Sequence, residues 1–201
     1  MSLRRTRLPA LPVILGSLVA VGACTASPPL HGDAAAGDLG SGHNATRATC
    51  SPPFGTAMPA CPGTGCPQNA VGAPDGITVD LTACGTLDLF LETGSLISGG
   101  TETDDLRVTL GAVGGLTQVE ASERGDRYTI IGFIAPASVP LPHGAVEACR
   151  AKLTGAAAAL SLSRCNTLAR ATFVRLIRDG TVSGASSVDA IEAISFQPAA
   201  P

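Results

Sequence analysis

Alternation of apolar and polar residues is the strongest signal in the C-terminal two thirds of the chain. The clearest runs place apolar side chains at every second position, and they lie at 79–83, 87–91 and 106–110. Shorter candidates of the same kind lie at 117–122, 127–134, 171–178 and 190–196. Because successive side chains of a strand point to opposite faces, this period predicts strands with one buried face. Glycine-rich breaks separate the runs, which favours an all-β antiparallel sandwich or barrel over a parallel α/β sheet.

One segment does not follow the period of two. Residues 144–153 are predicted to form a short helix, and the alanine run at 156–159 could extend it. Gly155 disfavours that extension because glycine is a poor helix former. We therefore expect 141–165 to be a helical insertion between two strands, closed by a disulfide.

The N-terminus has the pattern of a bacterial lipoprotein signal peptide, residues 1–23. Three arginines (Arg4, Arg5 and Arg7) precede an apolar stretch that ends at Val21-Gly22-Ala23-Cys24. That stretch, Leu8 to Val21, is too short to span a bilayer and has the length of a signal-peptide core. Small residues directly before a cysteine are typical of a lipobox, so we expect diacylglycerol on the Cys24 sulfur and a further acyl chain, such as palmitate, on its freed amine. The alternative is ordinary secretion with cleavage nearby and Cys24 left unpaired.

This signal predicts an exported protein anchored by lipid to the bacterial membrane. Buried acyl chains contribute about 0.8 kcal/mol per methylene, so several chains hold a protein durably. Thr25 follows the anchor cysteine where some lipoproteins retained in the inner membrane have aspartate. In a double-membraned cell we therefore expect the outer membrane or the cell surface.

Composition divides the rest of the chain into three parts. Residues 24–49 are rich in Ser, Pro, Gly and Ala and contain few large apolar side chains, which predicts a disordered, flexible tether. Residues 50–68 form a Pro- and Cys-rich cap, and residues 69–198 form the sandwich domain. Without the three arginines of the predicted signal peptide, the chain has ten basic and sixteen acidic residues, which is a formal charge of −6. The basic residues are scattered, so nothing indicates nucleic-acid binding.

Six cysteines follow Cys24, and an even number in an exported chain predicts three disulfides among fifteen pairings. They are Cys50, Cys61, Cys66, Cys84, Cys149 and Cys165. We expect Cys149 to pair with Cys165, and the other four to pair among themselves. A zinc site using Cys61, Cys66 and His43 is the alternative, but the spacing is longer than the usual two-residue knuckle.

Three stretches, in order, resemble a family of bacterial surface domains with the galactose-binding-like (discoidin-like) fold. They are NAVGAPDG at 69–76, GTLDLF at 85–90 with DDLRV at 104–108, and ARATFVRLIRD at 169–179 with VDAIEAI at 188–194. Residues 123–132 also match a family segment, with Tyr128 at its aromatic position. The resemblance covers about 130 residues and implies a jelly-roll β-sandwich that binds a ligand without catalysis. The chain departs from the family in having no tryptophan and a longer 141–165 segment.

The same resemblance implies a structural calcium ion. In the wider group a loop aspartate and a glutamate on the last strand hold Ca²⁺, and Asp75 and Glu192 occupy comparable positions. Calcium takes six to eight oxygens, so two carboxylates and backbone carbonyls would suffice. Alternatively, Asp75 only supports a Pro-Asp-Gly turn and Glu192 only faces solvent. Asp104 and Asp105 are a weaker third source of oxygens.

The sequence contains no recognisable catalytic set, so we predict no catalytic residue and no enzyme. His31 and His43 lie in the predicted tether, His143 lies in a loop, and no Gly-x-Ser-x-Gly motif is present. The predicted function is non-catalytic binding of a ligand or partner, such as a glycan or envelope protein. The alternatives are a carbohydrate-binding module and an envelope hydrolase with a site built from loops.

Aromatic side chains distinguish the glycan-binding alternative from the others, since sugar sites usually place an aromatic ring against the pyranose. We expect Phe90, Phe133, Phe173 and Phe196 on strands, most of them in the core, and Phe54 to be free. If Tyr128 and every phenylalanine are buried, the glycan hypothesis loses its main support.

Overall fold

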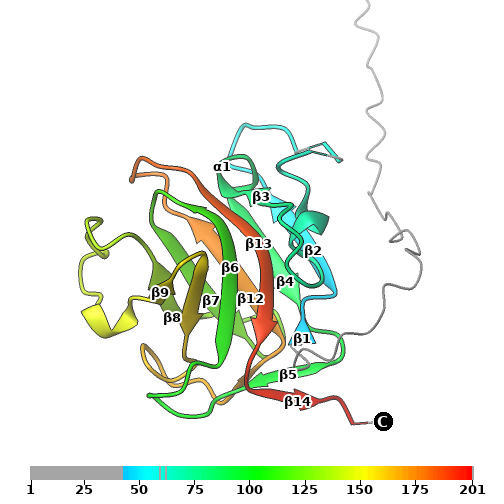
Figure 1. Cartoon of the computed structure of the whole chain (residues 1–201), viewed down its shortest axis with the longest axis vertical. Helices are drawn as coiled ribbons and strands as arrows, with labels where there is room; N and C mark the ends of the chain where they lie inside the picture. The colour runs from blue at the N-terminus through cyan, green and yellow to red at the C-terminus, as the bar shows by residue number, and fades with distance from the viewer. Residues whose placement is uncertain (1–42, 59, 62, 201) are drawn as a thin grey trace, which may run out of the picture. The chain divides into compact units, whose positions relative to one another are not determined.

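The computed structural model describes residues 43–58, 60–61 and 63–200, which form three antiparallel sheets (Figure 1). The six-stranded sheet comprises β1 (His43–Asn44), β13 (Ser186–Ala193), β6 (Leu106–Val113), β10 (Ala157–Leu160) and β9 (Lys152–Thr154) in that order, with β3 (Val79–Asp80) also on β13. The five-stranded sheet comprises β2 (Arg47–Ser51), β4 (Thr86–Phe90), β12 (Phe173–Arg178), β7 (Thr117–Ser122) and β8 (Thr129–Ile134). The small sheet comprises β11 (Arg170–Ala171), β5 (Gly94–Ile97) and β14 (Phe196–Pro198). The predicted signal peptide, Cys24 and the first part of the predicted tether lie outside the described residues.

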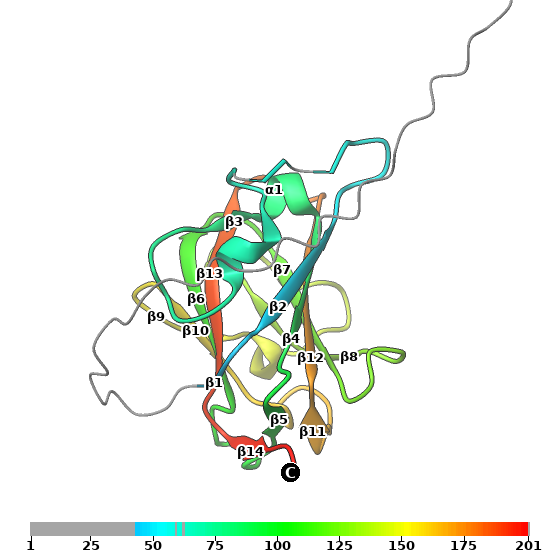
Figure 2. The same cartoon turned by 90° about the vertical axis from the view of Figure 1, so that its right-hand side faces the viewer.

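The two larger sheets form two layers with the hydrophobic core between them (Figure 2). Burial alternates along the strands, so that Leu87 and Leu89 of β4 and Val174 and Leu176 of β12 point inward. Inward-facing side chains of β6, β10 and β13 belong to the same apolar cluster. The predicted all-β, antiparallel, sandwich-like architecture is confirmed.

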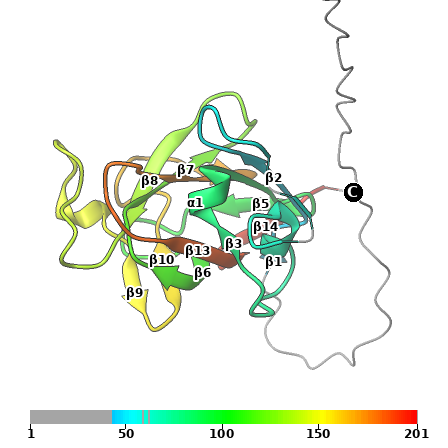
Figure 3. The same cartoon turned by 90° about the horizontal axis from the view of Figure 1, so that it is seen from above.

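A single helical turn, α1 (Leu81–Cys84), lies at one end of the two layers (Figure 3). We expected a strand over 79–83, but only Val79 and Asp80 are extended. The chain turns because the Asp80 carboxylate accepts the Thr82 N–H at 2.7 Å and so caps a helix. Gly85, with φ of 72°, then ends the turn.

The predicted helix at 144–153 is wrong. Only Glu147–Cys149 forms a short 3₁₀ turn, and Lys152 onward belongs to β9. The alanine run is strand β10, which pairs with β6 and buries Ala158 and Leu160 on alternate positions. Pairing with a neighbouring strand overrides the helix preference of alanine because it buries that face. Segment 141–165 is therefore part of the sandwich and not only an insertion between strands.

The sandwich also begins earlier than predicted. Residues 43–49, which we expected to belong to the flexible tether, form β1 and most of β2. Ala48 and Cys50 alternate with exposed residues and are buried, because β2 pairs with β4 along its whole length. Small apolar residues at every second position thus form an edge strand of the five-stranded sheet.

Three disulfides hold the described chain together. Cys149 is joined to Cys165, as predicted, and the other four cysteines pair among themselves as Cys50–Cys84 and Cys61–Cys66. The Cys61–Cys66 bond leaves neither of its sulfurs available as a thiolate ligand for zinc.

Asp105 is a fully buried carboxylate that joins three segments at one end of the six-stranded sheet. One oxygen accepts the Gly99 N–H at 2.8 Å and the Ser195 hydroxyl at 3.1 Å. The other accepts the Leu162 N–H at 2.9 Å and the Ser161 hydroxyl at 3.4 Å. Four donors thus satisfy a side chain that would otherwise be costly to bury. Its oxygens serve the fold, so they are not the free calcium ligands considered above.

Candidate binding site on the outer face of the five-stranded sheet

Alternation in the five-stranded sheet turns a second set of side chains outward. Strand register places Phe173 of β12 opposite Phe90 of β4, and Phe90 opposite Arg47 of β2. Two residues along, Arg175 is opposite Asp88. Directly opposite residues on one sheet face have Cβ atoms about 5 Å apart, so these side chains contact one another.

The first row is a stack of rings and a guanidinium. The ring centroids of Phe90 and Phe173 are 4.6 Å apart with an interplanar angle of 29°. The Arg47 guanidinium carbon lies 4.7 Å from the Phe90 centroid, within the range of a cation–π contact. At the other end the Gly125 backbone lies against Phe173, where a Cβ would come within 3.2 Å of the ring. Glycine is also suited to this position by its φ of +80°.

The second row is a polar triad. The Arg175 Nε donates to the Asp88 Oδ1 at 2.6 Å, and the Tyr128 hydroxyl donates to the same oxygen at 3.4 Å. The Arg175 guanidinium carbon also lies 3.8 Å from the Tyr128 ring centroid. Each member therefore contacts both others.

These contacts favour the ordinary protonation states at neutral pH. Burial, and next the Asp88 charge, raise the pKa of Tyr128 above its usual value of 10. The hydrogen bond with Asp88 is the main cause of the raised pKa of Arg175. At pH 7 the phenol is therefore a neutral hydrogen-bond donor and the guanidinium is charged.

Both rows line a shallow pocket of about 280 Å³. Its remaining polar wall includes Thr49 and Arg124, a residue of the loop between β7 and β8. The buried Ser122 hydroxyl accepts the N–H groups of Arg124 and Gly125 at 3.3 and 2.9 Å, which fixes the start of this loop. The pocket thus offers guanidinium and hydroxyl groups from two strands, β2 and β12, and one loop.

The structure does not bring the two predicted calcium ligands together in one hydrogen-bonded set. Asp75 accepts the Ile77 N–H at 2.8 Å, and the N–H groups of Asp75 and Gly76 donate to the Asp189 carboxylate at 3.1 Å each. Glu192 instead pairs with Arg107 at 2.8 Å. Among the described residues no group of three or more potential metal ligands occurs, and the calcium site stays a prediction.

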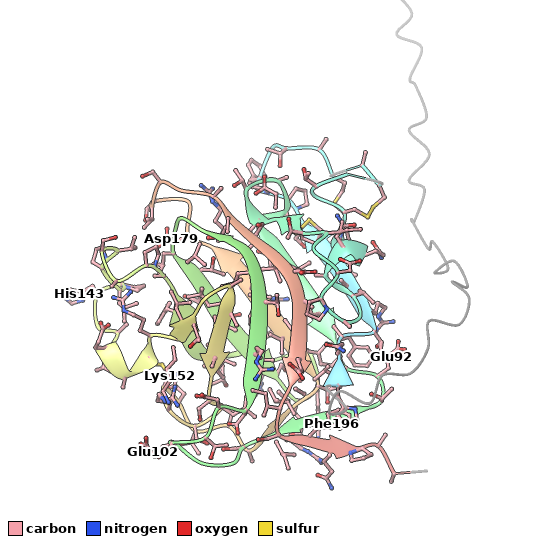
Figure 4. The ribbon with its side chains drawn as sticks, viewed as in Figure 1. Glu92, Glu102, His143, Lys152, Asp179 and Phe196 are labelled. Carbon is pink, nitrogen blue, oxygen red and sulfur yellow. A yellow bond between two sulfur atoms is a disulfide. The ribbon has the colours of Figure 1, made fainter. Side chains whose placement is uncertain are left out.

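The aromatic side chains only partly follow the expected placement. Phe133 is buried, as predicted, and Phe54 is fully exposed. Phe90 and Phe173, expected in the core, are half-buried on the outer face of the sheet. Phe196 of β14, labelled in Figure 4, is also half-buried. Its ring stacks on His43 with ring centroids 3.5 Å apart.

The remaining described histidine, His143, is exposed in the loop between β8 and β9 and does not line the pocket (Figure 4). Sequence analysis singled out Tyr128 but missed Asp88, Arg175, Arg47 and Arg124 as site residues. The sequence did contain one signal for them: Asp88 and Arg175 each lie two residues from a phenylalanine, on the outward-facing side of a run of period two. Nothing local indicated that these strands are neighbours.

Comparison of the sequence with models of known protein families and with curated proteins finds no match. Within residues 43–200, no helix has the length and apolar character needed to cross a membrane.

The single tyrosine of the chain allows a direct test of the polar triad. Because burial and Asp88 raise the pKa of Tyr128, alkaline titration of the phenolate absorbance should have its midpoint above pH 10. The stabilisation from the neutral phenol is complete below the unfolded-state pKa and is lost as the pH rises through the raised, folded-state pKa.

Asp88→Asn removes the charge and should move this midpoint down towards pH 10. The matched control Asp104→Asn, a half-exposed carboxylate outside the pocket, should leave it unchanged. A wild-type midpoint at or below 10, or one that does not respond to Asp88→Asn, would contradict the triad.

Proposed function

We propose that the protein is an exported bacterial lipoprotein, anchored by lipid at Cys24, whose sandwich binds an envelope ligand through the pocket on the five-stranded sheet. The lipobox pattern supports the anchor. Three disulfides support export, because such bonds persist in oxidising compartments. The observation that carries the binding function is the pocket itself, where the Phe90–Phe173 stack lies beside the Arg175–Asp88–Tyr128 triad.

The chemistry of the pocket favours binding over turnover. Among its described lining residues Asp88 is the one carboxylate, and it is already bonded to Arg175 and Tyr128. Glycoside hydrolysis ordinarily needs two carboxylates on either side of the scissile bond. A raised pKa keeps the Tyr128 phenol protonated, which makes it a poor nucleophile or base at neutral pH.

A jelly-roll sandwich of the galactose-binding-like kind is the fold we propose in detail. The order of the three sequence motifs and the antiparallel two-layer architecture support it. Among the alternatives, carbohydrate binding is favoured by the hydrogen-bonding groups of Thr49, Asp88 and Tyr128, which line the pocket and can bond to sugar hydroxyls. A calcium ion at Asp75 and Glu192 remains a secondary prediction.

Co-sedimentation with envelope material tests this proposal. The full chain, purified in detergent, should co-sediment with cell-wall polysaccharide isolated from the producing bacterium. Arg175→Gln, which breaks the triad, should weaken that binding about tenfold, as expected for loss of one charge-assisted contact.

In cells, Cys24→Ser should abolish palmitate labelling and release the protein from membranes, while leaving polysaccharide binding intact.

The matched control is Arg107→Gln, which breaks an ion pair with Glu192 on the other sheet. It should bind like the wild type. Equal binding by Arg175→Gln and the wild type would exclude the pocket as the binding site. A wild-type chain without palmitate label would exclude the lipid anchor.

A further inference from the structure

One arginine of the pocket has an ion-pair partner and two have none, and this difference indicates the chemistry of the ligand. Three arginines (Arg47, Arg124 and Arg175) line the pocket together with one carboxylate, Asp88, and Glu120 of β7 lies beside it, opposite Arg175. Arg175 is neutralised by Asp88. Within the described part of the chain, Arg47 and Arg124 have no ion-pair partner. Two uncompensated guanidinium groups in one small pocket favour a ligand that carries negative charge.

Arg47 is positioned for such a ligand. Its guanidinium lies over the Phe90 ring, which limits the rotamer entropy that binding would cost. A guanidinium that stacks by its flat face on an aromatic ring keeps its N–H edge for in-plane hydrogen bonds. A carboxylate accepts two such parallel bonds, which are stronger and more specific than neutral ones.

The aromatic rings of the pocket have little free face for stacking against a sugar. Phe90 is covered on its two sides by Arg47 and Phe173, and Phe173 by Phe90 and Gly125. The Tyr128 ring is covered on one face by Arg175. Recognition in this pocket therefore depends on charge and hydrogen bonds.

Hydroxyl and carboxylate groups of the pocket complement sugar hydroxyls. Thr49 and Tyr128 can donate and accept, and Asp88 can accept through Oδ2, since Arg175 and Tyr128 both donate to its Oδ1. A volume of about 280 Å³ lies just below the usual range of ligand pockets and suits one sugar unit better than a folded segment of a partner protein.

We propose that the pocket binds a uronic-acid unit of an acidic polysaccharide, with Arg47 and Arg124 holding the carboxylate and Tyr128, Asp88 and Thr49 contacting the hydroxyls. This inference rests on the proposed binding function and adds the class of ligand. It predicts discrimination between an acidic glycan and the same glycan without its carboxylates.

The probe is a galacturonic-acid oligosaccharide, and its matched control is the same oligosaccharide with the carboxyl groups reduced to alcohols. Calorimetric titration of the full chain in detergent should give an affinity at least tenfold higher for the acidic form at low salt. Because the attraction is electrostatic and near the surface, 1 M salt should remove most of this preference. Arg47→Gln and Arg124→Gln should each lower the affinity for the acidic form about tenfold.

Arg170→Gln is the control variant, since Arg170 is a strand arginine outside this pocket that donates to Gln197. It should bind like the wild type, and unchanged circular dichroism should confirm that all variants fold. Equal affinity for the acidic and reduced forms would overturn the inference but leave the binding function standing. Equal or tighter binding of poly-L-glutamate would overturn the glycan assignment. Binding of neither oligosaccharide would also overturn the inference, whereas loss of co-sedimentation with the envelope polysaccharide would overturn the proposed function itself.

Discussion

Asp105→Ala is expected to lower the free energy of unfolding by about 4 kcal/mol. The substitution removes the acceptor of two backbone N–H groups, those of Gly99 and Leu162, in a place that water does not reach. A buried donor left without a partner costs about 1–3 kcal/mol. The hydroxyls of Ser161 and Ser195 lose the same acceptor but can rotate, and Ser161 already has the Gly100 carbonyl at 2.9 Å.

The effect should be visible as a fall in melting temperature of about 8–16 °C for a domain of this size. Chemical denaturation followed by circular dichroism would give the free energy directly. Asp105→Asn should be less harmful, because one oxygen still accepts although the amide group opposes the other pair of donors.

Asp104→Ala is the matched control, since it removes the neighbouring carboxylate. Asp104 is half-buried and pairs with Arg164 at 3.0 Å and Lys152 at 3.6 Å. Pairs this close to solvent are worth about 1 kcal/mol or less. If Asp104→Ala and Asp105→Ala cost the same, the buried network around Asp105 does not have the structural role assigned to it.

The three disulfides should differ in how much they stabilise the fold, in the order Cys50–Cys84, Cys149–Cys165, Cys61–Cys66. Their sequence separations are 34, 16 and 5 residues. In the chain-entropy model a longer closed loop restricts the unfolded chain more, which gives about 4, 3 and 2 kcal/mol respectively. The first bond also joins β2 to α1, so it holds the outer strand of the five-stranded sheet that carries Arg47.

Pairwise replacement of each bond by alanines, with denaturation measured for every variant, tests this order. The Cys61→Ala, Cys66→Ala double variant is the control, because it removes two cysteines and one bond but closes the shortest loop. Equal losses for the longest and shortest loops would show that loop entropy does not set the contribution of these bonds. A loss under about 1 kcal/mol for Cys50 and Cys84 would show that β2 is held by strand pairing with β4 alone.

Several elements were predictable because their signal is local. A period of two in residues 117–122 predicted β7 with its observed bounds, since each side chain's face follows from that of its neighbour. The Cys149–Cys165 bond joins cysteines near each other in sequence and was also predicted. Alternation in 87–91 likewise located β4 to within a residue at each end.

The predictions of other elements failed because a strand distant in the sequence determined their conformation. Alanine favours helices, yet residues 157–159 of the run at 156–159 belong to β10, because they pair with the edge of β6 that β13 does not occupy. The composition of residues 43–49 resembles a linker, yet residues 43–44 pair with β13 as β1 and residues 47–49 pair with β4 as part of β2. Asp189 is a charged residue in the apolar run VDAIEA, which marks it as unusual but does not identify its partner. Its carboxylate accepts the N–H groups of Asp75 and Gly76, more than 110 residues earlier in the chain.

The amino-acid sequence by itself determined which positions alternate, and hence the all-β class, and supplied the cysteines that join its segments. Only the tertiary structure decided the candidate site, because Asp88 and Arg175 are 87 residues apart and meet through the pairing of β4 with β12. Alternation specifies whether a side chain points inward or outward within its own strand. Which strand lies beside it depends on burying both sheets against one core, and that is a property of the whole chain.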